Sequence, residues 1–593
     1  MTVTANLADW LRSHGVKRGD LVGIALRDNS EVGVAVPGAV ITARSDSVAK
    51  ADQEIRPRWA GWPDGAYDRL IADGVRLATA WDVAAVHRLR FGGWRADPGY
   101  VWAIERGLDP AKVGNAGTLF SDEEAGHLDP SARDDPAQWA AYALDIAINQ
   151  NKSLSGDGKH ASTARSESTV ELLCAELAAD GLPLNRQAIT ELLEEIIGPR
   201  DEAMTSRAER DARVLAHAPP GVTADLRSPQ QVLKLLGAVG IDVPDTRAHR
   251  LKSFDHPLVN ALLEWRRAER IATTYGYTWL DDHLGADDRL RGTWTGCDGA
   301  AGRMTASEGL HNMPAILRKA VLAEEGHVFV RADLGQIEPR VLAAVSGDRA
   351  PAAATEADDM YLPVAQTFGV SRDAAKVAVL GAMYGQTTGT GAQALRRLKR
   401  AYPVAMDYLD AADERARTGH DLRTHGGRLV RMRSGGTPPQ VAARGRYGRN
   451  AMIQGAAAEF FKMWAVTVRA RVPAARIVLC LHDELLIHTP EHNDEAVSTA
   501  VRDCLDEVSA RWAAGSGVRF NADISIVRSW ADAKSLGFAA DAAEDGDDDS
   551  GRRARAVVGA PRRDVHEARF NEFLSFVQAG EFGGWARVEP LVV

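Results

Sequence analysis

Cysteine is scarce in this sequence, which holds four in 593 residues: Cys174, Cys297, Cys480 and Cys504. They are scattered, and no two of them form a CxxC pair. Scattered cysteines are typical of reduced core residues in an intracellular protein. We therefore expect a cytoplasmic protein.

Long hydrophobic runs are also missing, although apolar residues make up 45% of the chain. No stretch of 18 apolar residues occurs, so we expect no membrane-spanning helix. The first residues lack a basic region followed by an apolar one, and we expect no secretory signal. The apolar content is ample for several cores, and the length predicts several domains.

An excess of positive charge is absent too, since the formal net charge is -10. Composition alone therefore argues against a nucleic-acid-binding protein. A nucleic-acid-binding protein need not be basic overall, however, because a local basic cleft is sufficient.

The most informative stretch is Leu481–His488, Leu-His-Asp-Glu-Leu-Leu-Ile-His. Apolar runs flank its polar triplet, which predicts a buried strand, a turn and a second strand. A carboxylate at such a break is costly to bury unless a cation or hydrogen bonds neutralise it. Asp483 is therefore a candidate metal ligand, and a plain surface hairpin is the alternative.

A second carboxylate motif lies 150 residues earlier. An apolar run beginning at Val328 ends at Asp333, and the polar segment Leu334–Arg340 should begin a helix. Two strands that each deliver one Asp can place both on one sheet, where divalent cations would offset their repulsion. Oxygen ligands suit Mg²⁺ or Mn²⁺. A two-metal site of this kind supports phosphoryl transfer.

Between these motifs, the stretch from Ser371 to Gly385 predicts a helix. One face of it carries residues spaced by four, namely Arg372, Lys376, Leu380 and Tyr384. The Gly/Thr-rich segment 386–391 ends the helix. Two cations, an apolar position and an aromatic ring would suit a nucleoside triphosphate. An ordinary amphipathic helix with solvated cations is the alternative.

Together these motifs resemble those of the family A DNA polymerases, the DNA polymerase I family. Asp333–Arg340 resembles the first catalytic motif, usually Asp-Tyr-Ser-Gln-Ile-Glu-Leu-Arg, and residues 482–484 match the second. The helix between them resembles the nucleotide-binding helix of the fingers. Gly302–Pro314 resembles the segment before the first motif, and Arg446–Gly455 resembles the helix that lines the primer–template cleft. The resemblance covers about residues 165–540 and is most specific from 293 to 490.

The resemblance implies catalytic roles for matching residues. Asp333 and Asp483 would ligate two Mg²⁺ ions, or Mn²⁺ in their place, with the Leu334 carbonyl as a backbone ligand. Arg372 and Lys376 would hold the triphosphate, and Lys376 is a candidate to protonate the pyrophosphate leaving group.

Other matching residues would position the substrates. Glu338 would be the steric gate that selects deoxynucleotides, and Tyr384 would guard the insertion site. Gln336 and His311 are further nucleotide-binding candidates, and Glu484 would support the metal cluster. The candidate contacts to primer, template and the minor groove of the nascent pair are Arg303, Arg446, Asn450, Gln454 and His482. Minor-groove acceptors are shared by all correct pairs, so such contacts would check shape and not sequence.

The sequence departs from the family pattern at three places. Leu380 stands where the family has Phe or Tyr, which predicts weaker nucleotide binding, slower insertion or altered sugar discrimination. Leu334-Gly335 replaces Tyr-Ser, which leaves the backbone carbonyl in place. Pro339 replaces Leu near a first helical turn, where a missing N–H is tolerated.

The family has a right-hand fold of palm, fingers and thumb, so we expect an α/β multi-domain chain with an N-terminal RNase H-like domain of the 3′–5′ exonuclease type. The expected ranges are 1–160 for a degenerate exonuclease-like domain, 161–290 for the thumb, 291–350 and 436–540 for the palm, 351–435 for the fingers, and 541–593 for an acidic linker and C-terminal tail.

The N-terminal resemblance rests on residues 1–150, with a strand pair expected at Leu21–Leu26 and Glu31–Val36. Proofreading by this fold needs an Asp-x-Glu on the first strand and two further Asp residues. No such first strand is found, and Asp52, Asp82 and Asp145 are the remaining candidates. We expect a structural domain without nuclease activity and no 5′-nuclease domain. Residual 3′–5′ exonuclease activity is the alternative.

The expected thumb is mostly helical and grips duplex through phosphates. Apolar spacing predicts helices at Ser168–Leu177, Asn185–Ile197, Ser228–Leu236 and Pro257–Leu280. Arg266, Arg267 and Arg270 are candidate phosphate contacts. A solvated helix face is the alternative for each of them.

The C-terminal tail begins with an acidic run at 541–549, followed by several arginines, and reads as a disordered linker. Ala568–Val577 is apolar enough to be a short binding element. Its pattern Asn571-x-x-Leu574-x-Phe576 faintly resembles the motif that docks bacterial sliding clamps. Packing on the polymerase itself is the favoured alternative.

The predicted function is template-directed synthesis of DNA from a primer 3′ end, in DNA replication or repair. The expected partners are primer–template DNA and dNTPs, and we expect a monomer. An inactive DNA-binding scaffold descended from a polymerase is the alternative from a non-enzyme class. The joint presence of four charged motif residues argues against it, because an inactive protein has no physical reason to maintain buried like charges. These residues are Asp333, Asp483, Arg372 and Lys376. Glu338 argues against use of ribonucleotides. Ala- and Arg-rich usage indicates a GC-rich genome, such as that of an actinobacterium or one of its phages. A polymerase without a 5′ nuclease and with an atypical fingers residue favours phage replication, and a host repair enzyme is the alternative. The expected location is the cytoplasm of a bacterial or phage-infected host cell.

Overall fold

The computed structural model describes residues 6–26, 31–63, 65–108, 134–385 and 390–534. The chain contains both helices and strands, and the described residues divide into two compact units. The first unit extends to Leu182 and also includes Arg291–His311 and Ala323–Ala533. The second unit holds Pro183–Leu290 and Asn312–Leu322. The C-terminal tail, with Leu574 and its neighbours, lies outside the described residues.

The N-terminal part of the first unit is built on a five-stranded sheet in the order β3-β2-β1-β4-β5. The strand pair expected at Leu21–Leu26 (β1) and Glu31–Val36 (β2) is present and antiparallel. β2 also pairs antiparallel with β3, whereas β1–β4 and β4–β5 are parallel. The remaining strands are β3 (Ala39–Arg44), β4 (Arg58–Gly61) and β5 (Ala80–Asp82).

Helix α6 (Pro136–Leu154) lies directly against this sheet because two strand positions are glycine. A Cβ at Gly33 would lie 1.9 Å from the Pro136 carbonyl oxygen, and one at Gly23 would lie 2.2 Å from that of Ala140. The other helices here are α1 (Leu7–Ser13), α2 (Ser45–Ile55), α3 (Ala66–Ala72), α4 (Val83–Phe91), α5 (Pro98–Glu105) and α7 (Gly158–Asp180).

A four-stranded antiparallel sheet forms the centre of the first unit, in the order β13-β14-β10-β15. Its strands are β10 (His327–Leu334), β13 (Arg476–Leu481), β14 (Glu484–Pro490) and β15 (Ala522–Val527). The expected strand, turn and strand around residue 483 are therefore confirmed. β10 and β14 are buried along almost their whole length, as their continuous apolar runs require. Helices α20 (Pro438–Arg471) and α21 (Asp494–Trp512) pack together beside the sheet.

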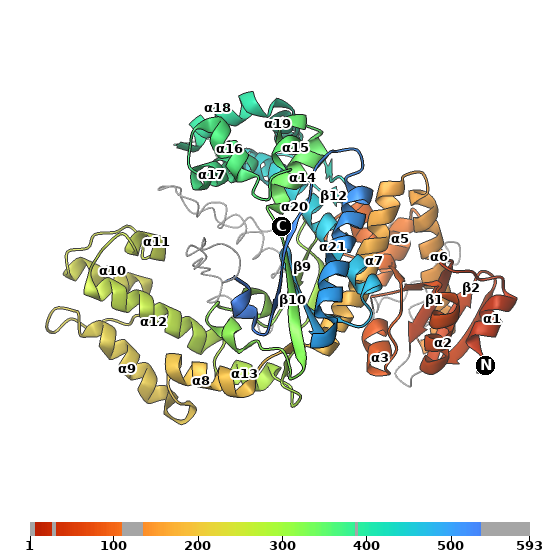
Figure 1. Ribbon diagram of the computed structural model, residues 1–593, viewed down its shortest axis with the longest axis horizontal. Helices are drawn as coiled ribbons and strands as arrows, with labels where there is room; N and C mark the ends of the chain where they lie inside the picture. Colours follow the sequence, from red (N-terminus) through yellow and green to blue (C-terminus); the bar gives the residue numbers. More distant parts are fainter. Residues whose placement is uncertain (1–5, 27–30, 64, 109–133, 386–389, 535–593) are drawn as a thin grey trace. The chain divides into compact units, whose positions relative to one another are not determined.

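Six helices follow β10 along the chain and form the green-to-teal group in Figure 1. They are α14 (Ile337–Ser346), α15 (Arg349–Ala354), α16 (Tyr361–Phe368), α17 (Arg372–Met383), α18 (Thr390–Ala401) and α19 (Pro403–Arg417). The helix predicted from Ser371 onward is α17. Ser371 caps it by accepting the Ala374 N–H at 3.2 Å. Most of the segment 386–391 that was expected to end it, residues 386–389, lies outside the described part of the chain.

The second unit is helical around an apolar core that includes Val232, Leu236 and Leu262. Its helices are α8 (Arg186–Ile197), α9 (Ala203–Leu215), α10 (Pro229–Ala238), α11 (Ala248–Leu251), α12 (Pro257–Thr274) and α13 (Tyr277–His283).

The single helix predicted over Pro257–Leu280 is wrong, because α12 ends at Thr274 and α13 begins at Tyr277. Tyr275 leaves the helix, and its hydroxyl donates to the Asn312 carbonyl at 2.6 Å. A Cβ at Gly276 would lie 2.6 Å from the Ala272 carbonyl oxygen, so glycine allows the tight break.

All four cysteines are free, and three are buried as expected. Cys297 is the exception, since it is half-buried and its sulfur accepts from Arg428 at 3.0 Å. Within the described residues, no helix is long and apolar enough to cross a membrane.

Candidate active site

The two motif aspartates meet in the central sheet. Asp333 is the penultimate residue of β10, and Asp483 lies in the turn between β13 and β14. Antiparallel pairing sets Asp333 opposite Glu484, and the Leu334 N–H donates to the Asp483 carbonyl at 3.1 Å. Strands separated by 150 residues in sequence thus bring both carboxylates to one end of the β10–β14 pair.

Sequence reasoning missed a cation at this point. Arg331 is 4% exposed, and its guanidinium pairs with Asp333 at 2.5 Å, with Glu484 at 3.1 Å and with Asp523 of β15 at 3.1 Å. A charge inside the apolar run Val328-Phe-Val-Arg-Ala was the available signal. A buried arginine is rarely tolerated without carboxylate partners. The chain therefore supplies one positive charge of its own to the carboxylate group.

The carboxylates suit a divalent cation. Burial raises the pKa of Asp483 to about 6, and the nearby Glu484 adds to this effect. A carboxylate that is costly to ionise alone gains most from a cation beside it. Oxygen ligands are those that Mg²⁺ and Mn²⁺ prefer. The Glu484 carboxylate is held by Arg331 and by the Trp530 indole N–H at 2.5 Å, which fits a supporting role.

The predicted gate residue is held on two sides. Arg303, the first residue of β9 (Arg303–Ala306), donates to Glu338 at 3.0 Å. The Tyr384 hydroxyl, at the C-terminal end of α17, donates to the other carboxylate oxygen at 2.9 Å. Burial and this neighbouring carboxylate raise the pKa of Tyr384, so it remains a donor at neutral pH. Three separately predicted residues thus form one hydrogen-bonded group.

The predicted stripe on α17 is half-buried along its length. Arg372, Lys376, Leu380 and Tyr384 share this state, whereas Val377, which lies off the stripe, is 65% exposed. Arg372 donates to Asp359 at 2.6 Å and to Asp373 at 3.3 Å. It is therefore an ion-paired residue in this structure, and a phosphate would have to compete with both carboxylates.

Gln336, a predicted nucleotide contact, has a structural role in this structure. Its side-chain oxygen accepts from Arg340 at 3.3 Å and from the Met360 N–H at 3.2 Å. Arg340 is fully buried and also donates to several backbone carbonyls, which ties the start of α14 to the loop before α16.

The two predicted histidines lie against each other. The rings of His311 and His482 meet edge to face with centroids 4.6 Å apart. His482 has a φ of 55°, and Gln336 has a φ of 47°, so a left-handed backbone occurs within each of the two aspartate motifs. Such conformations in residues other than glycine cost energy and cluster at functional sites.

The stripe predicted on the later helix lies in α20. Arg446 and Gln454 are half-buried, and Asn450 is 4% exposed. Neither polar atom of the Asn450 amide has a hydrogen-bond partner in the described structure. The neighbouring Arg449, which was not predicted, donates to the Ala382 carbonyl at 2.9 Å and to Asp410 at 2.6 Å. It connects α20 to the end of α17 and to α19.

The three aspartates considered for exonuclease chemistry lie on different elements. Asp52, in α2, accepts the Trp59 indole N–H at 2.8 Å and the Ala78 N–H at 2.9 Å. Asp82 caps α4 through the Ala85 N–H at 2.7 Å, and burial raises its pKa to about 7. Asp145, in α6, pairs with Arg106. Each has a local structural role, and β1 carries no carboxylate.

The predicted phosphate contacts of the second unit lie on α12. Arg266 donates to the Thr246 carbonyl within the same unit, Arg267 is exposed and Arg270 is half-buried. This contact of Arg266 holds α12 to the loop before α11. A phosphate-binding role for these three residues stays a prediction.

The fold matches a solved polymerase domain. The POL domain of Pol1 from M. smegmatis, in a complex with DNA primer-template and dNTP, superposes with a TM-score of 0.67 at 21% identity. The match covers 90% of this chain and 99% of that one. This similarity shows the fold.

The family follows from the sequence match. The model of DNA polymerase family A matches residues 201–532, more than half of the chain, which therefore belongs to this family. DNA polymerase I of Chloroflexus aurantiacus is 30% identical over 337 residues, or 48% of this chain and 35% of the relative. That of Mycobacterium tuberculosis is 28% identical over 413 residues, or 61% and 44%. DNA polymerase theta of Caenorhabditis elegans is 26% identical over 304 residues, or 47% and 18%. The chain thus spans less than half the length of these relatives.

Proposed function

We propose that this chain is a template-directed DNA polymerase that adds deoxynucleotides to a primer 3′ end. The observation that carries the proposal is the meeting of Asp333 and Asp483 across the β10–β14 pair, joined through the hydrogen bond from Leu334 to the Asp483 carbonyl. The family match and the motif residues on α17 and α20 support it.

Two divalent ions, Mg²⁺ or Mn²⁺, would be held by Asp333, Asp483 and the Leu334 carbonyl. When bound, they would activate the primer hydroxyl and offset charge on the leaving pyrophosphate. Arg372 and Lys376 would hold the triphosphate from α17, and Lys376 would donate a proton to the leaving group. Release of Arg372 from Asp359 would accompany triphosphate binding, because the two anions compete for one guanidinium.

Other residues would select the nucleotide and hold the DNA. Glu338, held by Arg303 and Tyr384, would exclude a ribose 2′-hydroxyl. Gln336 and His311 would act mainly by shaping the site, as their contacts indicate. The stripe on α20 would contact the minor groove, and the unpaired Asn450 amide supports this proposal.

The domain assignments fit this function. We propose that the central sheet is the palm, that the helices from α15 to α19 are the fingers, and that residues 161–290, most of which belong to the second unit, are the thumb. The strand order β3-β2-β1-β4-β5 supports an RNase H-like N-terminal domain. The structural roles of Asp52, Asp82 and Asp145 support our prediction that this domain has no nuclease activity.

Primer extension tests the proposal. With Mg²⁺ and the four dNTPs, the wild-type chain should extend a primer on a DNA template, while Asp483→Ala and Asp333→Ala should be inactive but still bind the duplex. Asp503→Ala, at an exposed residue of α21, is a matched control. An inactive wild type that binds DNA would instead support the scaffold alternative. Incubation with labelled primer and no dNTPs detects 3′–5′ degradation, and degradation that is lost in Asp82→Asn would overturn the prediction of an inactive nuclease domain.

A further inference from the structure

A group of three metal-binding side chains lies at the far end of β10 from Asp333. It consists of Glu324, His327 and His488, whose ligand atoms all lie within 4.8 Å of one another. His327 is the first residue of β10 and Asp333 is six residues further on, which is about 20 Å along a strand. The group is therefore separate from the carboxylates of the proposed active site. Within the described residues, it is the one group of three or more such ligands.

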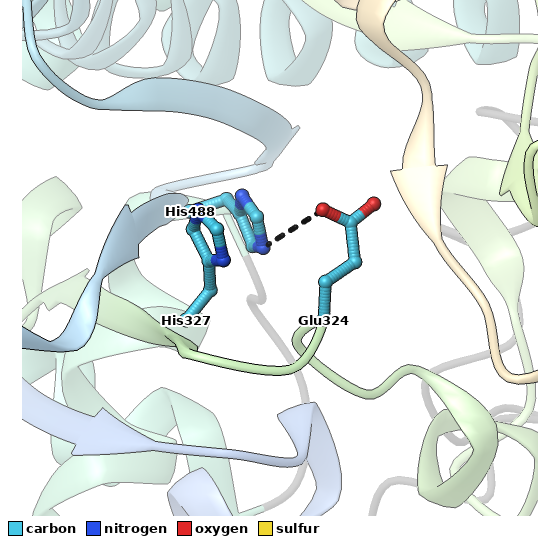
Figure 2. A group of neighbouring side chains, drawn as sticks. All are labelled: Glu324, His327 and His488. Carbon is cyan, nitrogen blue, oxygen red and sulfur yellow. Dashed lines mark ion pairs between the residues drawn. The ribbon is translucent and has the colours of Figure 1, made fainter.

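Two rigid strands hold the histidines. In the β10–β14 register, His488 pairs with Phe329 and His327 pairs with Pro490, so both imidazoles lie on the same face as Phe329. Figure 2 shows the rings face to face, with centroids 4.6 Å apart and planes 9° apart. Phe329 is fully buried and contacts His488, with ring centroids 5.7 Å apart. The two ligands are thus fixed by strand pairing over an apolar floor.

The third ligand comes from the turn just before β10. Glu324 reaches toward His488, with a carboxylate oxygen 3.9 Å from Nε2 (Figure 2). Backbone hydrogen bonds hold the turn on both sides, from Ala323 to the Arg528 carbonyl at 2.8 Å and from Glu491 to the Gly326 carbonyl at 3.0 Å. Because the backbone of this turn is already ordered, binding of an ion loses little conformational entropy, and this favours affinity.

A contact with the backbone favours one tautomer of His327. Nδ1 of His327 lies 3.1 Å from the Glu325 carbonyl oxygen, and only a protonated Nδ1 can donate to it. Nε2 is then the atom with a lone pair. Donation of the second ring N–H to a backbone carbonyl is the usual arrangement of a metal-ligating histidine.

We propose that Glu324, His327 and His488 form a binding site for Zn²⁺. Two imidazole nitrogens and one carboxylate oxygen are typical zinc ligands, and a water would complete a tetrahedron. Imidazole favours Zn²⁺ over Mg²⁺, so this site and the Asp333–Asp483 site should select different ions. In a tetrahedral site, neighbouring ligand atoms are about 3.3 Å apart. To bind one ion, one imidazole ring must rotate out of the stacked arrangement about its side-chain torsion χ2, which is soft. The ligand atoms must also move closer together by about 1 Å.

The bound ion would connect the turn before β10 to β14. It would therefore stabilise the strand pair that carries Asp333, without touching the reacting groups. We expect Zn²⁺ to raise the melting temperature of the full chain and to leave Mg²⁺-dependent primer extension unchanged. This proposal does not rest on the proposed function, because it concerns binding of an ion to the free protein.

Titration of the full chain with Zn²⁺, by calorimetry and with Co²⁺ as a spectroscopic probe, tests the site. Excess Mg²⁺ is present throughout to occupy the carboxylates of the proposed active site. We expect one Zn²⁺ per chain, and Co²⁺ absorption of a tetrahedral nitrogen and oxygen site. His327→Ala and His488→Ala should each weaken binding by about tenfold or more, and Glu324→Gln should weaken it less.

His492→Ala provides the matched control, because His492 is an exposed histidine close in sequence to His488. It should bind Zn²⁺ as the wild type does. Melting curves of every variant without metal show whether it folds, and His327→Ala carries the test if the buried His488 proves necessary for folding. Absence of Zn²⁺ binding, or equal binding by the wild type and the two histidine variants, would overturn the proposal.

Discussion

Arg331 makes a cation of the chain itself part of the carboxylate group at the end of β10. Its guanidinium lies between Asp333, Glu484 and Asp523, all within 3.1 Å. These pairs raise the pKa of Arg331 against the opposing effect of burial, so it stays charged. A fixed positive charge beside a proposed metal ligand has two opposite effects. It stabilises the metal-free protein, and it competes with the metal for the same carboxylate oxygen.

Arg331→Ala should therefore separate these two effects. We expect the free energy of unfolding in EDTA to fall by about 3–5 kcal/mol, because three carboxylates lose their buried partner. We expect Mn²⁺ to bind about tenfold tighter or more, because the competing charge is gone. Denaturant unfolding and Mn²⁺ titration by electron paramagnetic resonance measure the two quantities. Arg471→Ala, which removes an exposed arginine paired with Glu507, is the control. Mn²⁺ binding that is unchanged or weaker would contradict the competition.

Asp483 predicts a pH dependence of stability in the metal-free protein. Its pKa rises from 3.8 to about 6 on folding, so ionisation of Asp483 costs more in the folded than in the unfolded protein. This cost is complete above pH 6, where the folded protein is ionised at Asp483. It disappears below about pH 4, where Asp483 is protonated in both states. Asp483→Asn removes the cost. We expect it to raise the free energy of unfolding in EDTA by about 1–3 kcal/mol at pH 8 and by about half as much at pH 5. A gain that is equal at the two pH values would show that the charge is not its source.

The hydroxyl of Tyr384 offers a test of the proposed gate, Glu338, that leaves the tyrosine ring in place. Tyr384→Phe removes the 2.9 Å hydrogen bond from Tyr384 to Glu338. The hydrogen bond from Arg303 to Glu338 is retained. We expect Glu338 to become less fixed, and the ratio of deoxynucleotide to ribonucleotide incorporation to fall by roughly 3- to 10-fold. Single-nucleotide incorporation with dCTP and CTP opposite the same template base measures this ratio. Tyr408→Phe, in α19, is a matched control. An unchanged ratio would mean that Arg303 alone holds the gate.

At the scale of elements, α17 presents one half-buried stripe, and Leu380 is its apolar member. An aromatic ring at this position would add stacking area on the sugar and base of the nucleotide. Leu380→Phe should therefore tighten dNTP binding by about 2- to 10-fold and speed insertion, as measured in single-turnover incorporation. Val377→Phe adds the same ring at a position off the stripe that is 65% exposed, and it should change neither quantity. If Leu380→Phe behaves like this control, the departure from the family pattern has no effect on binding.

The sequence was informative where a functional residue type lies in a regular pattern of a single helix or strand. The positions of Asp333, Asp483 and the α17 stripe could be predicted because each follows from an apolar run or from a spacing of four within one element. Arg331 could not be assigned a role in this way. Its partners Glu484 and Asp523 come from two other strands, and their proximity depends on the strand order β14-β10-β15.

The break between α12 and α13 shows a different limit. Helical apolar spacing continues through Tyr275 and Gly276, so periodicity alone joins the two helices. The break depends on a hydrogen bond from Tyr275 to Asn312, a residue that lies in a distant part of the sequence. Gly276 was a local signal for it, but an isolated glycine inside a helical pattern is often tolerated. Tertiary contacts decided the outcome.

At the scale of the molecule, α7 packs against both the N-terminal sheet and α20 within the first unit. Leu172 and Ala175 pack with the residues of the N-terminal sheet and its helices. Glu167, one turn earlier, is fully buried and pairs with Lys462 of α20 at 2.5 Å and with Arg428. The N-terminal domain therefore covers apolar surface of a helix that also supports α20, which carries the proposed DNA-binding stripe.

This shared helix predicts that the N-terminal domain is needed for stability even if it has no nuclease activity. A chain without residues 1–156 would expose the apolar face of α7 that contains Leu172 and Ala175. At about 25 cal/mol per Å², such exposure costs several kcal/mol and promotes aggregation. We expect the shortened chain to melt at a lower temperature and to lose primer extension on mild heating. Full-length Asp145→Asn, altered at a partly exposed residue of the same domain, should behave as the wild type in both assays. Equal melting temperatures for the shortened and complete chains would mean that α7 is stabilised from the α20 side alone.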